Sequence, residues 1–286
     1  MFKKLLNNVF SSEGVHIINC CPNVEKYIKA TKHSNDKSYK HYERYIYRHY
    51  LRNVNKYIML RDRHLAGFGL SFYAFENRIA LKKNIALITE LKIEEVIKES
   101  YFECSRVILN PDLKVLLFPT CEYTCGFTPS SNFIVLYVNC SGNQEEVHNQ
   151  VRWTFAHEYA HTCDIKDADL NSRDVPTHND TVLKDMVFEG KANTFANTLF
   201  GHHGPQMERE YCSKDWAFYK ERLNEPGYTI SYDQQCQLGS DSFSRYDVYF
   251  YGTELVERYL LTNPDTLVSE VIGMKPERFY GEKDKI

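Results

Sequence analysis

The stretch His157-Glu158-Tyr159-Ala160-His161 decides how the rest of the chain is interpreted. On an α-helix, residues four apart lie one turn above each other, so His157 and His161 can both face one cation. Glu158 then lies about 100° around the helix, beside the same cation. Two imidazole ligands and a carboxylate base are the parts of a hydrolytic zinc site, and this spacing predicts one.

The residues before the motif predict the helix that carries it. Asn143 or Ser141 can cap its start, and acidic residues follow in the first turn, where the helix dipole favours them. Apolar side chains recur every fourth residue as a stripe that faces a core: Val147, Val151 and Phe155. The alternative is a chance pair of histidines on a solvated face. With 11 histidines among 286 residues that spacing is rare by chance, so we favour the metal site.

A zinc hydrolase holds its ion with three protein ligands, and Glu189 is the best candidate for the third. It lies on a second predicted helix, 181–201, which Asn179, Asp180 or Thr181 can cap and which Gly201 ends. Apolar residues surround Glu189, and a carboxylate among them is costly to bury unless a cation compensates it. Gly190 would let the first helix and the metal approach closely. The alternative is an ordinary, partly exposed glutamate.

Residues 146 to 280 resemble the predicted Zn-dependent proteases of the gluzincin type, a largely bacterial domain family of unknown detailed function. Three stretches carry the resemblance: Phe155-Ala-His-Glu-Tyr-Ala-His161, Leu183-Lys-Asp-Met-Val-Phe-Glu-Gly-Lys-Ala192 and Tyr249-Phe-Tyr-Gly-Thr-Glu-Leu-Val256. The family pattern implies a zinc-binding helix, a helix with Glu-Gly-x-Ala, a Tyr/Gly-containing helix and a short terminal helix. Here Asn263-Pro264-Asp265 is expected to start the last of these.

Two departures from the family pattern concern the supporting residues. Many gluzincins have an Asp four residues past the ligand Glu, and this chain has Asn193, a weaker acceptor for an imidazole N–H. The third motif keeps only part of each Gly-Tyr pair. Tyr249 is our preferred oxyanion donor and Tyr251 the reserve, although any one of 21 tyrosines can be a packing residue instead.

The resemblance and the motif together predict a zinc-dependent metallopeptidase with one Zn²⁺ per chain. In this hypothesis His157, His161 and Glu189 hold the ion, and Glu158 acts as general base toward the zinc-activated water. One alternative is a metallopeptidase that cleaves regulators, as repressor-processing enzymes do. Another is a non-catalytic scaffold that binds zinc, but such a site needs no base.

The pattern along the chain predicts an α+β fold, mainly helical and zincin-like, with a small β-sheet ahead of the His-Glu-x-x-His helix. Residues 24–110 are expected to be helical, with one helix over 85–109. Short β-branched runs predict strands at 113–118 and 133–139. A turn-rich stretch separates them, with Gly126, Pro129, Ser130 and Ser131. By the resemblance, 133–139 is a candidate for the edge strand that pairs with an extended substrate, and an ordinary core strand would show the same pattern.

No Pro/Gly/Ser linker divides the chain into independent domains. We therefore expect a helical N-terminal lobe, 1–110, and a zinc peptidase domain, 111–286. At 43% hydrophobic and 26% charged residues, the composition is ordinary for a globular enzyme of this length.

Charge and cysteine content limit the partners and the compartment. A net charge of −3 gives no electrostatic footprint for nucleic acid or an anionic membrane, so the expected partner is a peptide or protein substrate. The interleaved basic and aromatic residues of 39–50 fit a helix with tyrosines inward and cations outward. The amino terminus lacks a continuous apolar signal segment. Nine cysteines form no regular framework, which favours free thiols and a cytoplasmic location.

Two other groups of metal-binding residue types are weaker candidates. Cys121 and Cys125, like the pair Cys20 and Cys21, have no matching second pair for a structural zinc site. The adjacent His202 and His203 are expected on a surface loop.

Overall fold

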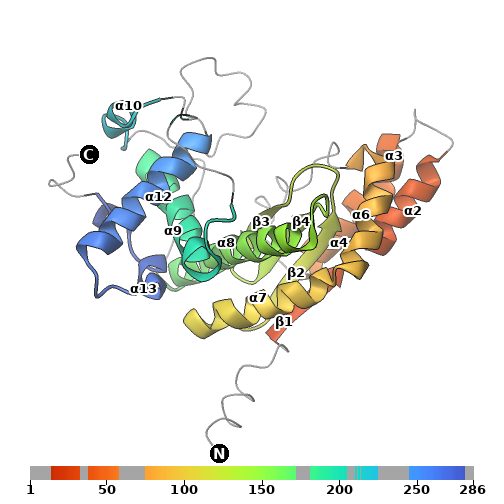
Figure 1. Ribbon diagram of the computed structural model, residues 1–286, viewed down its shortest axis with the longest axis horizontal. Helices are drawn as coiled ribbons and strands as arrows, with labels where there is room; N and C mark the ends of the chain where they lie inside the picture. The colour runs from red at the N-terminus through yellow and green to blue at the C-terminus, as the bar shows by residue number, and fades with distance from the viewer. Residues whose placement is uncertain are drawn as a thin grey trace, which may run out of the picture. The chain divides into compact units, whose positions relative to one another are not determined.

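The computed structural model describes residues 14–32, 38–57, 75–171, 181–204, 210, 212, 214–224 and 245–280 (Figure 1). These residues form a mainly helical structure with one small four-stranded sheet, which confirms the predicted α+β class at that level. The chain divides into two compact units, Met1–Thr162 and Cys163–Ile286. The division that we expect near residue 110 stays a prediction.

The first unit contains the sheet and the helices around it. Its elements are β1 (Val15–Asn19), α2 (Cys21–Thr31), α3 (Ser38–Tyr42), the π-helix η3 (Glu43–Tyr47), α4 (Arg48–Tyr57), α6 (Arg78–Glu90), α7 (Ile93–Val107), β2 (Leu113–Pro119), β3 (Cys125–Ser130), β4 (Phe133–Val138) and the first part of α8 (Gln144–Asn171).

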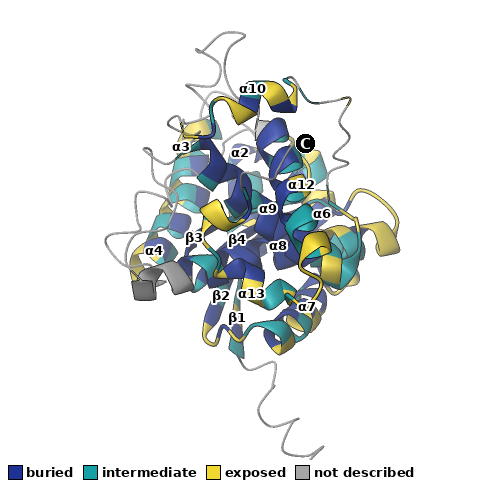
Figure 2. Cartoon of the chain, turned by 90° about the vertical axis from the view of Figure 1, so that its left-hand side faces the viewer, coloured by how far each residue is buried: buried dark blue, intermediate teal, exposed yellow. Residues whose placement is uncertain are grey.

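The sheet has the strand order β1-β2-β4-β3. The pairs β1–β2 and β2–β4 are parallel, whereas β3 pairs antiparallel with β4. Every residue of β4 is buried, as the dark blue of the central strands in Figure 2 shows. The strands predicted at 113–118 and 133–139 are confirmed, but the expectation that 133–139 is an edge strand is wrong. It lies between two strands, and a fully apolar run is typical of that position.

The edge strand on this side of the sheet is β3, which the sequence presents as turn-rich. Gly126, Pro129 and Ser130 all belong to it. Glycine and proline weaken a strand interior, but an edge strand tolerates both, because one side of it makes no ladder hydrogen bonds. These residue types are typical of turns, and here they form an edge strand.

The helix predicted over 85–109 is instead two helices, α6 and α7, which meet at Leu91 and Lys92. Lys92 adopts the left-handed conformation, with φ 52° and ψ 44°. Its carbonyl accepts from the amides of Glu95 and Val96, so a new helix starts directly after the break. Apolar periodicity continues through the break, and for that reason the pattern alone suggests one helix.

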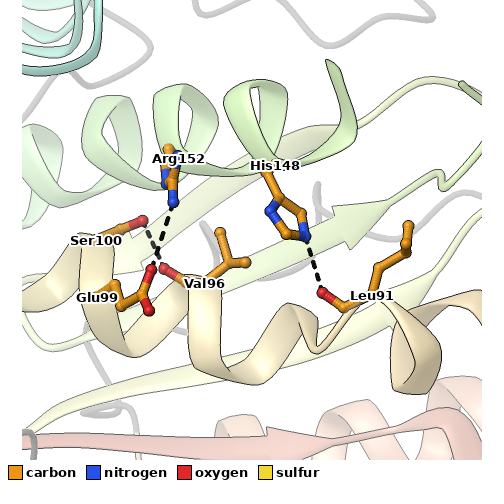
Figure 3. Close-up of polar contacts among 6 residues, drawn as sticks. All are labelled: Leu91, Val96, Glu99, Ser100, His148 and Arg152. Atoms are coloured by element: carbon orange, nitrogen blue, oxygen red, sulfur yellow. Dashed lines mark hydrogen bonds and ion pairs between the residues drawn. The ribbon is translucent and has the colours of Figure 1, made fainter. Parts of the chain in front are cut away.

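Contacts with α7 fix the first half of α8, and Figures 1 and 3 show the two helices running side by side. His148 Nε2 donates to the Leu91 carbonyl at 2.9 Å, at the break between α6 and α7 (Figure 3). One turn later, an Arg152 guanidinium nitrogen lies 3.4 Å from a Glu99 carboxylate oxygen. The two contacts join the first turns of α8 to the α6–α7 break and to α7.

The second unit is helical where it is described. Its elements are the end of α8, α9 (Val182–Phe200), α10 (Trp216–Lys220), α12 (Arg245–Thr262), α13 (Val268–Ile272) and the 3₁₀ turn η7 (Pro276–Arg278). Apolar residues of these helices form one core, which includes Met186, Tyr219, Leu255, Val256 and Val271.

The last helix begins later than predicted. Asn263-Pro264-Asp265 forms a turn, and α13 starts at Val268 after Leu267. The Glu270 carboxylate accepts from the Leu267 amide at 3.0 Å and caps the helix there. None of the helices in the described ranges combines the length and the apolar character needed to cross a membrane.

Candidate metal and catalytic site

The helix α8 begins as its sequence predicts. The Glu146 amide donates to Asn143 Oδ1 at 3.0 Å, and the Asn143 amide donates to a Glu146 carboxylate oxygen at 3.2 Å. This reciprocal pair is a capping box, and it satisfies amides that have no partner within the helix. The predicted apolar stripe is buried: Val147, Val151 and Phe155. The helix is therefore anchored at its start and along one face.

His157 and His161 lie in the middle of α8, and both are buried. Their Nε2 atoms are 3.0 Å apart, and the ring planes meet at 89°. Trp153 stacks on His157, with ring centroids 5.4 Å apart and planes inclined by 25°. Two imidazole nitrogens this close together can serve as two ligands of one cation.

Glu158 is 5% exposed and lies against the edge strand. Thr128 Oγ1 of β3 is 2.7 Å from Glu158 Oε2 and 3.0 Å from the Glu158 carbonyl oxygen. Gly126 of the same strand is in contact with the Glu158 side chain, because a Cβ at Gly126 would lie 2.3 Å from Glu158 Cγ. The predicted general base is thus held in one place by the sheet.

The opposite side of the motif is tied to the loop before β2. The Tyr159 hydroxyl donates to the Ile108 carbonyl at 2.6 Å and accepts from the Asn110 amide at 3.0 Å. The side chain of Asn110 donates to Thr162 Oγ1 at 2.8 Å and to the Ser131 carbonyl at 2.7 Å. These buried groups are satisfied and fix the rotation of α8 about its axis.

Glu189 lies on α9, whose predicted ends are confirmed. Thr181 accepts from the Lys184 amide as N-cap, and Gly201 ends the helix with φ 77°. One ligand atom from each of His157, His161 and Glu189 can be chosen so that all three lie within 4.8 Å of one another, a grouping that could hold a metal ion. Two histidines and one glutamate are the donor set of a catalytic zinc site.

Gly190 makes room for α12, whereas we expected from the sequence that it makes room for the first helix, α8, and the metal. A Cβ on Gly190 would lie 2.1 Å from the Gly252 carbonyl oxygen, and a Cβ on Gly252 would lie 1.9 Å from the Met186 carbonyl oxygen. The space that Gly190 leaves is filled by the backbone of α12. The expectation that it admits the first helix and the metal is therefore corrected. The two glycines let α9 and α12 cross in close contact.

Hydrogen bonds also join α9 to α12 within the third motif. Asn193 Nδ2 donates to Thr253 Oγ1 at 2.9 Å, and that hydroxyl donates to the Tyr249 carbonyl at 2.8 Å. Tyr251 is buried in the core of the second unit, and its hydroxyl donates to the Lys214 carbonyl at 2.9 Å. Tyr249 is half-buried. Tyr249 as oxyanion donor stays a prediction, and Tyr251 already has a structural role.

Lys191, in the Glu-Gly-x-Ala stretch, is buried and paired. Its Nζ lies 2.9 and 3.0 Å from the two carboxylate oxygens of Asp164 and 2.8 Å from the Ile272 carbonyl oxygen. The pair lies close in sequence to two predicted ligands, since Asp164 follows His161 by three residues and Lys191 follows Glu189 by two. Through it, Lys191 of α9 is bonded to Asp164 of α8 and to the end of α13.

Sequence reasoning missed four of these supporting residues: Gly126, Thr128, Asp164 and Lys191. A signal existed for Lys191, because a lysine on the apolar face of a helix needs a buried partner. Nothing in a single sequence indicates that Thr128 contacts Glu158, 30 residues away.

The weaker metal candidates do not form a second group. In the ranges that the structure covers, one set of three or more histidines, cysteines or carboxylates is close enough to hold an ion, and it contains none of the cysteines. His202 and His203 are exposed, as predicted. In α3, η3 and α4, Tyr42 and Tyr50 are buried while Arg44 and Arg48 are exposed, which fits the predicted helical pattern in part. Tyr39 departs from it, because it is 61% exposed.

A family described as Predicted Zn-dependent protease (DUF2268) matches residues 93–280, more than half of the chain. No curated protein and no solved structure matches it.

Proposed function

The chain belongs to the family of predicted Zn-dependent proteases, and from this premise we propose that it is a zinc metallopeptidase that hydrolyses peptide bonds. The observation that carries the proposal is the grouping of His157, His161 and Glu189, with ligand atoms within 4.8 Å of one another. The proposal includes one Zn²⁺ per chain and a zincin-like architecture of the gluzincin type.

The chemistry of the donor set fits zinc. Catalytic zinc is held by three protein ligands, often two histidines and one glutamate, and the fourth position is left to water or substrate. A structural zinc site usually has four protein ligands, and the described residues around this group supply three. The open position favours catalysis over a non-catalytic scaffold.

Bound zinc would supply a water with a pKa lowered to about 7 and would polarise the carbonyl under attack. Glu158 is the group that holds and moves the proton, because it is next to a ligand histidine and buried. Its carboxylate would accept a proton from the water and later give it to the leaving amine. Tyr249 is proposed as a donor to the developing oxyanion, a role typically worth about 3 kcal/mol.

The proposed substrate is an extended peptide or protein segment. Because 133–139 is a central strand, the substrate must pair with a different strand from the one expected. The edge strands of the sheet are β1 and β3, and 133–139 lies between β2 and β3. An edge strand can add an extended chain to its sheet through backbone hydrogen bonds, and the first three residues of β3 are half-buried. We therefore assign the substrate strand to β3, which also contacts Glu158. A regulator-cleaving role stays the alternative, and the cytoplasmic location stays a prediction.

A cleavage assay tests the proposed activity. Purified protein is incubated with a mixed peptide library and Zn²⁺, and new termini are identified by mass spectrometry. We expect cleavage by the wild type and its loss, by about a hundredfold or more, in Glu158→Gln, because general base catalysis contributes that much. Equal cleavage by Glu158→Gln would show that this carboxylate is not the base.

A further inference from the structure

Two residues of β3 touch the side chain of Glu158, and they lie two positions apart. Residues i and i+2 of a strand share a face, so Gly126 and Thr128 are presented to α8 together. Thr128 Oγ1 lies 2.7 Å from Glu158 Oε2, a distance typical of a strong hydrogen bond to a charged acceptor. Thr128 as a whole residue is 9% exposed, so water has little access to this contact.

The backbone of β3 is irregular at this point. Cys125, Gly126 and Phe127 pair in one register with β4, and the register has shifted by Ser130. The shift falls on Thr128 and Pro129, and proline is tolerated in a sheet at such irregularities. Bulges next to active sites re-aim side chains. The direction of the Thr128 hydroxyl is thus set by a local feature of the strand.

Gly126 provides the space that the carboxylate occupies. A Cβ at this position would lie 2.3 Å from Glu158 Cγ and 2.7 Å from both Cδ and Oε1. Real Cβ atoms do not approach other atoms so closely. Any side chain at position 126 would displace Glu158 from its present orientation.

We propose that Gly126 and Thr128 are positioning residues for the general base: the glycine makes room for Glu158, and the threonine hydroxyl holds one carboxylate oxygen. The inference rests on the proposed function of Glu158. A hydroxyl has one proton, and when Thr128 donates it to Oε2, the other oxygen, Oε1, is left for proton transfer. The strand assigned to the substrate is then also the strand that orients the base.

Three single variants test the hydroxyl. Thr128→Val removes it with little change in shape, and Thr128→Ser keeps it. Thr31→Val is the matched control, because it removes a buried threonine hydroxyl outside the site: Thr31 Oγ1 donates to the Tyr27 carbonyl at 2.9 Å in α2. On the best-cleaved library peptide, we expect Thr128→Val to lower kcat about tenfold with KM and bound zinc unchanged, since a hydrogen bond to a charged group is lost. Thr128→Ser keeps the hydroxyl and should restore most of the wild-type kcat, and Thr31→Val should stay within about twofold of the wild type.

A readout without turnover uses crystal structures of the zinc-loaded proteins. We expect one Glu158 rotamer in the wild type and in Thr128→Ser, and several, or a displaced one, in Thr128→Val. Gly126→Ala should displace the carboxylate as well. If Thr128→Val does not fold, Thr128→Ala makes the same comparison.

The outcomes separate this inference from the proposed function. If Glu158→Gln is inactive while Thr128→Val keeps the wild-type kcat and the wild-type Glu158 rotamer, the positioning role is wrong and the peptidase stands. If Glu158→Gln cleaves as the wild type does, both are wrong. A fall in bound zinc in Thr128→Val would overturn the inference too, because the hydroxyl would then act on the metal ligands.

Discussion

Lys191 carries its charge in the interior of the second unit, with a side chain 5% exposed, and its partner Asp164 is 15% exposed. Removing one member of a buried pair leaves the other charge uncompensated. We expect Lys191→Met to lower the free energy of unfolding by about 3 kcal/mol, measured by urea denaturation.

The double variant Lys191→Met/Asp164→Leu serves as the control. It removes both charges, so it should recover part of the stability that the single variant loses. A single variant as stable as the wild type would mean that the pair contributes nothing.

Cys21 and Cys140 are buried thiols whose ionisation is suppressed. Burial, and then the nearby Glu94 charge, raises the pKa of Cys21 from 9.0 to about 12, and burial raises the pKa of Cys140 to about 12. The thiolate is the reactive form, so both should resist alkylation at pH 8.

Iodoacetamide labelling followed by peptide mass spectrometry measures this resistance. We expect both cysteines to react at least about a hundredfold more slowly in native than in urea-unfolded protein. Because the native pKa is raised, the unfolded thiols ionise first, and stability should fall as the pH rises from 9 towards 12. Rapid labelling of the native protein at either position would contradict the assignment.

At the scale of elements, the break between α6 and α7 depends on one strained residue. Lys92 has φ 52°, which costs a non-glycine residue about 1 kcal/mol. Its ion pair with Glu95, at 3.5 Å on the surface, offsets little. Lys92→Gly should therefore stabilise the protein by up to about 1 kcal/mol in urea denaturation.

The matched control is Lys98→Gly, an exposed lysine inside α7. There the same substitution should destabilise by about 0.8 kcal/mol, because glycine weakens a helix interior. The test is that the two substitutions change the free energy of unfolding in opposite directions. If both change it in the same direction, the backbone conformation of Lys92 is not the cause.

Helix ends that are marked by a capping side chain or a terminal glycine could be predicted from the sequence, and elements that depend on distant contacts could not. The caps Asn143 and Thr181 and the end at Gly201 follow from side chains that satisfy nearby backbone groups. The strand β3 could not be predicted from local signals. Its glycine makes room for Glu158, and its proline lies at a register shift, and both features exist only in the folded chain.

The same distinction holds for the candidate site. The spacing of His157, Glu158 and His161 is a property of one helix, so the sequence alone predicts that they share one side. The contact of Gly190 with Gly252 joins helices far apart in sequence, and no local pattern specifies it. Supporting residues of this kind need the tertiary structure.

At the scale of the molecule, the family match starts at residue 93, whereas the sheet begins at β1. The pairing of β1 with β2 runs from Val15↔Leu113 to Asn19↔Leu117. A fragment 93–280 would expose this edge of β2, together with the apolar residues Val115, Leu116 and Leu117. Exposed apolar edges promote aggregation.

We therefore expect the fragment to aggregate or to lack cooperative unfolding, while residues 1–280 behave as the full chain does. Size-exclusion chromatography and circular dichroism would measure both. A monomeric, cooperatively folding fragment would show that the N-terminal strand is dispensable.

The most direct test of the zinc hypothesis is the zinc content of the purified protein, by elemental analysis after dialysis against trace zinc. We expect one zinc per chain in the wild type and in Glu158→Gln, and a large loss in His161→Ala and Glu189→Gln, because each of these two variants would remove a predicted ligand. Less than a tenth of an equivalent in the wild type, or undiminished zinc in both ligand variants, would contradict the assignment of His157, His161 and Glu189 as the metal site.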